Sequence, residues 1–161
     1  MKKTLSIILM LLMLGCSLIR NPATVKMEYL EQIKDWQQRQ QKEGWTIELV
    51  DEIVREVRWN ASYVPDAIET DYWDTFREAY NKGFMGDCED IAVAIVGTLK
   101  HLNYPHKAMI RIVMTATPLD HAIVVVEMPD GEMREYDSVI STAVDVLFYR
   151  KVTDFDESKT N

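Results

Sequence analysis

One cysteine of the chain stands in a setting that suits nucleophilic chemistry. Cys88 lies in the run Gly-Asp-Cys-Glu-Asp at residues 86–90, and an apolar segment with helical periodicity follows it. The pattern therefore predicts Cys88 at about the first position of a helix, where aligned peptide dipoles and unpaired backbone N–H groups favour an anion. A catalytic cysteine also needs a base that takes its proton and a group that orients the base. We take Cys88 as the candidate nucleophile.

Two residues further along the chain can supply the base and the orienting group. His121 opens one predicted strand and Asp137 closes the next, with the turn residues 129–131 between them. A three-residue loop there puts His121 and Asp137 on one face of the strand pair, two residues away from directly opposite. A two-residue loop puts them on opposite faces. Asp130 and Glu135 are nearby alternatives to Asp137 as the orienting group.

The acidic residues around the cysteine work against its ionisation. Asp87, Glu89 and Asp90 crowd negative charge near Cys88, which disfavours the thiolate and raises the thiol pKa. The His121 imidazolium, a nearby Arg or Lys, or a bound cation would offset this charge. Clustered carboxylates suit Ca²⁺, but the spacing alone does not require a metal. Asp87 is also a natural helix N-cap, with Asp90 in the position of a capping box.

The segments that must position these residues divide into helices and then strands. Apolar residues recur at Met27, Leu30, Ile33 and Trp36, which predicts a helix that stops at Gly44. The periodicity predicts further helices over residues 47–58, 74–80 and 88–102, and strands over residues 108–116, 121–128 and 132–137. Residues 141–152 fit either a strand or a helix. Helices followed by an antiparallel meander predict an α+β domain, with the helix of the nucleophile packed on the sheet.

The start of the chain is typical of an exported protein. Lys2 and Lys3 precede an apolar run of about ten residues, which is too short to span a bilayer. The run ends at Met-Leu-Gly-Cys, residues 13–16, which resembles the lipobox of bacterial lipoproteins; the alternative is an ordinary secretory signal. We expect a signal peptide over residues 1–15, with Cys16 lipidated. An acylated Cys16 cannot bridge to Cys88, which would leave Cys88 as the one free thiol in an oxidising compartment.

The rest of the chain has the length of one domain. We expect a tether over residues 16–24, a domain over residues 25–152 and an acidic tail over residues 153–161. The chain of 161 residues carries 18 Lys and Arg against 26 Asp and Glu, a formal net charge of −8. This balance argues against nucleic acid as a partner and against a polybasic contact with a membrane surface.

Several of these motifs together resemble the bacterial transglutaminase-like cysteine proteinases. The run at residues 86–92, preceded by Asp-Tyr-Trp-x-Thr at residues 71–75, is similar to the core motif of that family. His-Ala at residues 121–122 and Tyr-Asp-Ser at residues 136–138 follow in the same order. The resemblance covers about residues 45 to 140. It implies a papain-like, transglutaminase-like fold and a periplasmic enzyme; the best-known members clip surface adhesins near their N-termini and so release biofilm.

The resemblance also implies roles for individual residues. The cysteine of the family motif is the nucleophile, the histidine the base and the later aspartate its orienting group, which correspond to Cys88, His121 and Asp137. Acidic residues flanking the family's cysteine help bind calcium, which implicates Asp87 and Glu89 as calcium ligands. The hydrolytic chemistry itself requires no cofactor.

These observations lead us to expect a cysteine peptidase of the bacterial cell envelope. It would be anchored by lipid facing the periplasm and would act on a protein substrate there. Ser17, which follows the lipidated cysteine, is not the Asp that favours retention in the inner membrane, so we favour the outer membrane. Two alternatives stay open: acyl transfer to an amine at the same site, as in a transglutaminase or amidase, and a non-catalytic calcium-binding module of the envelope.

Overall fold

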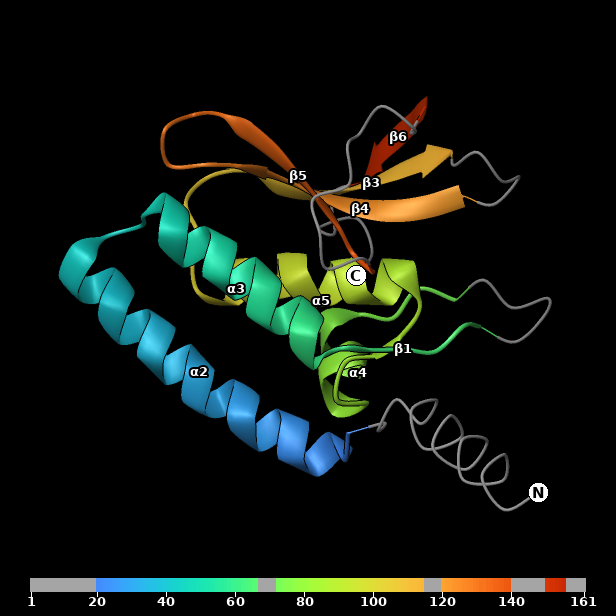
Figure 1. The fold of residues 1–161 in the computed structure, drawn as a ribbon, viewed down its shortest axis with the longest axis horizontal. Coiled ribbons are helices and arrows are strands. Elements are labelled where there is room, and N and C mark those ends of the chain that lie inside the picture. Colours follow the sequence, from blue (N-terminus) through green and yellow to red (C-terminus); the bar gives the residue numbers. More distant parts are fainter. Residues whose placement is uncertain (1–19, 67–71, 115–119, 140–149, 156–161) are drawn as a thin grey trace, which may run out of the picture.

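A computed structural model describes residues 20–66, 72–114, 120–139 and 150–155. It contains a layer of helices packed against an antiparallel sheet, which confirms the α+β prediction (Figure 1). The expected signal peptide, Cys16 and the first part of the tether lie outside the described residues, as do residues 140–149 and the end of the expected tail. Among the described residues, no helix combines the length and the apolar character needed to span a bilayer.

The elements follow the order predicted from the sequence, with two short strands added. The helices are α2 (Pro22–Glu43), α3 (Ile47–Asn60), α4 (Phe76–Asn81) and α5 (Cys88–His101), and the strands are β1 (Ser62–Tyr63), β2 (Met85–Gly86), β3 (Ala108–Met114), β4 (Asp120–Glu127), β5 (Met133–Asp137) and β6 (Arg150–Phe155). β1 and β2 form a parallel pair, and the other four strands form one sheet in the order β5-β4-β3-β6.

Helix α5 is the centre of the fold. It lies between the sheet on one side and helices α3 and α4 on the other (Figure 1). Every residue from Glu89 to Leu99 is buried, which is the expected state of a helix that is surrounded by other elements. The first residue of this helix is Cys88, so the thiol is held on the most enclosed element of the protein.

Helix α2 ends at the predicted Gly44 but buries only part of the apolar stripe seen in the sequence. Ile33 and Trp36 are buried, whereas Met27 and Leu30 are 67% and 48% exposed. The residues that α2 buries are Val25, Tyr29, Ile33 and Trp36. Tyr29 sets this rotation of the helix, because its ring packs edge-on against Phe84 and its hydroxyl lies 3.1 Å from the Thr98 hydroxyl of α5.

The strands β3, β4 and β5 form the predicted antiparallel meander. Their register decides the loop length that the sequence left open. Ile123 lies opposite Asp137, and the backbone N–H of Met128 donates to the carbonyl of Glu132 over 2.7 Å, so residues 129–131 form a three-residue loop. Gly131 has φ +86°, the left-handed conformation that such a loop commonly requires.

The end of the described chain differs from the prediction. β6 pairs antiparallel with β3, with Thr153 opposite Ile112 and Phe155 opposite Ile110. Residues 153–155, which we assigned to the acidic tail, are therefore part of the sheet. The polar composition of this segment suggested a tail, but its backbone hydrogen bonds to β3 hold it in the sheet.

Candidate active site

The start of α5 presents the candidate nucleophile. Cys88 is the first helical residue, as predicted, and Asp87 stands at the N-cap position. The capping box expected here was wrong, since the Asp87 side chain makes no capping hydrogen bond. The carboxylate of Asp90 instead accepts the backbone N–H of Asp74 over 2.8 Å, within the core. Burial raises the pKa of Asp90 to about 6.

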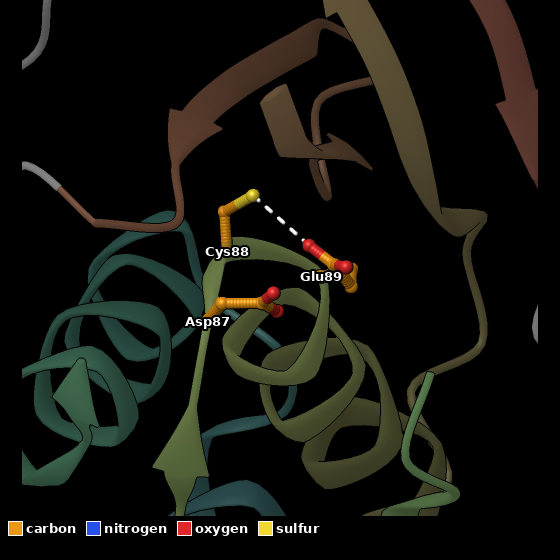
Figure 2. A group of neighbouring side chains, drawn as sticks. All are labelled: Asp87, Cys88 and Glu89. Atoms are coloured by element: carbon orange, nitrogen blue, oxygen red, sulfur yellow. Dashed lines mark hydrogen bonds between the residues drawn. The ribbon is translucent and has the colours of Figure 1, made fainter. Parts of the chain in front are cut away.

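Cys88 is a half-buried free thiol that is hydrogen-bonded to its neighbour. Its Sγ donates to Oε2 of Glu89 over 3.0 Å, and the two side chains lie on the same side of the helix start (Figure 2). Burial raises the pKa of the Cys88 thiol to about 12, and the Glu89 carboxylate acts in the same direction. The backbone N–H of Ala122, which faces the sulfur, acts to lower this pKa. Burial and the contact with Glu89 therefore favour the neutral thiol of Cys88.

His121 and Asp137 meet on one face of the sheet. Nε2 of His121 lies 3.1 Å from Oδ2 of Asp137, and both side chains are largely buried. This contact follows from the register, because Asp137 pairs with Ile123, two residues along β4 from His121. The three-residue loop thus gives the arrangement in which the two side chains share a face.

Surrounding groups hold this pair in place. The second carboxylate oxygen of Asp137 accepts the backbone N–H of Val139 over 2.8 Å. Arg58 of α3 donates to the main-chain carbonyl of Asp137 over 3.3 Å, and the buried hydroxyl of Ser138 donates to the carbonyl of Ala122 over 2.6 Å. The sequence did not point to Arg58, which resembles any polar residue of an amphipathic helix. Ser138 falls within the Tyr-Asp-Ser motif but had no assigned role.

The three candidate residues come together through Ala122. Its backbone N–H faces the Cys88 sulfur, and it directly follows His121 on β4. The start of β4 therefore lies against the start of α5, and β5 brings Asp137 to the same place. This arrangement places a thiol, an imidazole and a carboxylate at one end of the sheet, as a cysteine-dependent acyl transfer requires.

The other polar residues considered from the sequence have separate contacts. Glu135 is paired with Arg111 of β3, and Asp130 accepts the backbone N–H of Glu132 within the turn. Neither is the partner of His121. His101, at the end of α5, is exposed, and Trp73 of the Asp-Tyr-Trp-x-Thr run packs half-buried against the main core.

Asp87 and Glu89 form an acidic pair beside the thiol. One oxygen of each and the Cys88 sulfur all lie within 4.8 Å of one another (Figure 2). Burial raises the pKa of Asp87, and it raises the pKa of Glu89 to about 8. Oδ1 of Asp87 is buried and makes no hydrogen bond to the described residues. Two closely spaced, desolvated carboxyl groups with an unused oxygen are suited to a hard cation.

Comparison with known proteins identifies the fold. No protein-family model matches the sequence, and no curated protein is similar to it. Among solved structures, calcium-bound LapG of Legionella pneumophila gives a TM-score of 0.55 at 24% identity, over 66% of this chain and 65% of LapG. EGTA-treated LapG gives a TM-score of 0.54 at the same sequence identity. A provisionally assigned cysteine protease of Cytophaga hutchinsonii gives 0.58 at 16% identity, over 78% of this chain and 42% of that protein.

These likenesses confirm the transglutaminase-like fold expected from the sequence. The matched region spans just under two thirds of LapG and less than half of the second protein. The agreement therefore concerns the fold of part of each protein.

Proposed function

We propose that this protein is a cysteine peptidase of the bacterial cell envelope that cleaves a peptide or amide bond in a protein substrate. Cys88 is the nucleophile, His121 the base and Asp137 the group that orients the base. The observation that carries the proposal is the 3.1 Å contact between His121 and Asp137, made directly beside the residue whose N–H faces the Cys88 sulfur. The likeness of the fold to LapG and to the provisionally assigned cysteine protease of Cytophaga hutchinsonii supports it.

The geometry assigns each residue a part in the reaction. Nε2 of His121 contacts Asp137, so Nδ1 is the nitrogen that accepts the proton of the Cys88 thiol. The sulfur attacks the substrate carbonyl, and the new S–C bond gives an oxyanion that the Cys88 backbone N–H at the helix N-terminus can stabilise. His121 then gives the proton to the leaving amine as the C–N bond breaks. Water attacks the resulting thioester, with His121 as base, and releases the acid and the thiol.

Asp87 and Glu89 are the residues that would hold a calcium ion. The unused, buried oxygen of Asp87 and the closeness of the two carboxyl groups fit such an ion. When bound, calcium supplies positive charge next to Cys88, which favours the thiolate and offsets the acidic neighbours. Glu89 then ceases to act as a free acceptor for the thiol proton.

One observation favours the alternative of a non-catalytic calcium-binding module. The pKa of Cys88 is raised to about 12 by burial and by Glu89, which is the opposite of what an activated thiol needs. The two proposals differ in what calcium does to the thiol. In the peptidase, calcium increases the reactivity of Cys88, whereas in a binding module it leaves that reactivity low.

The location of the protein belongs to the same proposal. Lipidation of Cys16 would tether the domain to the envelope facing the periplasm, with the outer membrane favoured by Ser17. Intact-mass analysis of the membrane fraction tests this part. A mature chain that begins at a triacylated Cys16 supports it, and an unmodified chain cleaved at another position contradicts it.

Peptidase activity can be tested in cells that carry either the wild-type protein or Cys88→Ala. Free N-termini of envelope proteins are labelled and identified by mass spectrometry in both strains. New N-termini that appear only with the wild-type protein support cleavage. If the N-termini are identical in the two strains and a labelled amine is incorporated only when Cys88 is present, the reaction is acyl transfer to an amine and not cleavage. Identical N-termini without amine incorporation would contradict the enzymatic function.

A further inference from the structure

The main-chain groups of Ala122 point to the side of the sheet where β5 lies. Along an antiparallel strand, successive residues direct their N–H and carbonyl groups to one neighbouring strand and then to the other. The N–H of Met128 bonds to the carbonyl of Glu132, on the side of β5, over 2.7 Å. The N–H of Glu127 bonds to the carbonyl of Lys107, on the side of β3, over 2.8 Å. In steps of two residues from Met128 along the unbroken register, Ala122 therefore faces β5.

Strand β5 ends before it pairs with Ala122. The last pair of the register joins Ile123 to Asp137, so within the described residues the ladder gives Ala122 no strand partner on this side. The N–H of Ala122 instead faces the sulfur of Cys88 at the start of α5. The early end of β5 thus leaves a main-chain donor of the sheet for the thiol.

The residue that follows β5 holds the other main-chain group of Ala122. The hydroxyl of Ser138 donates to the Ala122 carbonyl over 2.6 Å, and Ser138 is 0% exposed. A hydrogen bond in such a buried setting is electrostatically stronger than one in water. It ties the end of β5 to Ala122 through a side chain, while the Ala122 N–H stays turned to the sulfur.

Two consecutive residues after the ladder's last full turn thus hold two consecutive residues of β4. Asp137 contacts the imidazole of His121 over 3.1 Å, and Ser138 bonds to the carbonyl of Ala122. The first contact orients the proposed base, and the second fixes the main chain beside the proposed nucleophile. One short segment, residues 137–138, therefore sets both groups that face the thiol from the sheet.

We propose that Ser138 is a positioning residue of the active site, whose bond to the Ala122 carbonyl keeps the Ala122 N–H directed at the Cys88 sulfur. A donor to the sulfur is most valuable when the sulfur is charged, because hydrogen bonds to charged acceptors are the strong ones. Without the hydroxyl, the Ala122 N–H is free to pair with the Ser138 carbonyl, as in a continued ladder. This inference rests on the proposed peptidase function, in which Cys88 is the nucleophile, and adds a residue to it.

The first measurement follows the N–H of Ala122 by NMR. His121 is the only histidine of the chain that an alanine follows, so histidine labelled with ¹³C at the carbonyl and alanine labelled with ¹⁵N select this one amide. Cys88→Ala removes the sulfur. In the otherwise wild-type, full-length protein with calcium, we expect this change to shift the Ala122 amide proton upfield, because the proton loses its acceptor. In Ser138→Ala, the same change should leave the amide proton unshifted.

The second measurement is the rate of iodoacetamide labelling of Cys88 at neutral pH with calcium. Ser138→Ala should be labelled about tenfold more slowly than the wild type, the effect of one lost hydrogen bond to a charged sulfur. Tyr104→Phe is the matched control. The Tyr104 hydroxyl also donates to a carbonyl of β4 over 2.6 Å, but to that of Glu127, at the opposite end of the strand. Its removal should change neither the labelling rate nor the response of the Ala122 amide to Cys88→Ala.

The outcomes separate this inference from the proposed function. An Ala122 amide that does not respond to Cys88→Ala in the otherwise wild-type protein overturns the inference without any change at Ser138. An amide that responds equally in Ser138→Ala also overturns it, as does labelling of Ser138→Ala that is as fast as that of Tyr104→Phe. In each of these cases the peptidase function stands. A wild-type Cys88 that does not react with iodoacetamide overturns both.

Discussion

Gly86→Ala should destabilise the protein strongly, because β2 passes against the side chain of Asp90. A Cβ atom added at Gly86 would lie 2.2 Å from Oδ2 and 2.4 Å from Cβ of Asp90. No rotation of the Asp90 side chain relieves the contact with its own Cβ. The carboxylate is also held in place, because it accepts the N–H of Asp74 over 2.8 Å and is 4% exposed.

The expected loss follows from these two contacts. Overpacking of a buried site costs about 1–3 kcal/mol. If Asp90 is displaced, the buried N–H of Asp74 also loses a charged acceptor, at a cost of about 1.5–3 kcal/mol. We therefore expect Gly86→Ala to lower the free energy of unfolding by about 3 kcal/mol. The shift of β2 would also move Cys88, two residues further on, and slow its labelling.

Urea unfolding followed by tryptophan fluorescence measures this loss. Gly131→Ala is the matched control: it also adds one methyl group, and nothing lies within 4 Å of the added Cβ. Its cost is confined to the left-handed backbone at φ +86°, about 1–2 kcal/mol. A Gly86→Ala protein that is as stable as the wild type, or more stable than Gly131→Ala, would refute the close packing of β2 on α5.

Three further predictions concern the surroundings of the site. Glu89→Gln removes the charge that accepts the hydrogen bond of the Cys88 thiol. In the presence of chelator, the pKa of Cys88 should therefore fall by about one unit, and the rate of iodoacetamide labelling at pH 9 should rise about tenfold. An unchanged labelling rate would contradict the effect of Glu89 on the thiol. The folded-state pKa of Asp90, about 6, lies above its unfolded value, so its contribution to stability should fall as the pH rises from about 4 to 6. In urea titrations, the free energy of unfolding of Asp90→Asn should not show this fall between about pH 4 and 6. If the free energies of unfolding of the wild type and Asp90→Asn change with pH in parallel, the raised pKa of Asp90 is contradicted. Ser138→Ala leaves a buried carbonyl without its donor and should cost about 1–2 kcal/mol in urea unfolding; an unshifted midpoint would show that the bond contributes nothing.

The helices and the meander could be predicted because their signals are local. The change of apolar period after Pro105 marks where helices give way to strands, and Cys88 begins α5 as expected. For the turn at residues 129–131, the sequence allowed a loop of two or three residues. Only the three-residue loop, which the structure has, puts His121 and Asp137 on the same face of the sheet. The choice between them depends on the hydrogen bonds that close the loop, which no local pattern specifies.

The features that were missed depend on contacts between distant segments. Asp90 has the position of a capping residue, but Asp74, sixteen residues earlier, uses its carboxylate. Arg58 reaches the Asp137 carbonyl across 79 residues of sequence. β6 forms because it pairs with β3. Its own sequence is rich in charged residues and does not predict a strand. In each case the partner is set by the tertiary structure.

The rate of Cys88 labelling by iodoacetamide as a function of pH tests the central claim most directly. It is measured for the wild type and for His121→Ala, with calcium and with chelator. We expect the thiol in calcium to ionise below the value of about 8.5 for free cysteine, and His121→Ala to slow its reaction at neutral pH. With chelator, the thiol should stay unreactive at neutral pH, as its pKa of about 12 requires. A slow thiol that responds to neither calcium nor His121→Ala would contradict the proposed catalytic pair.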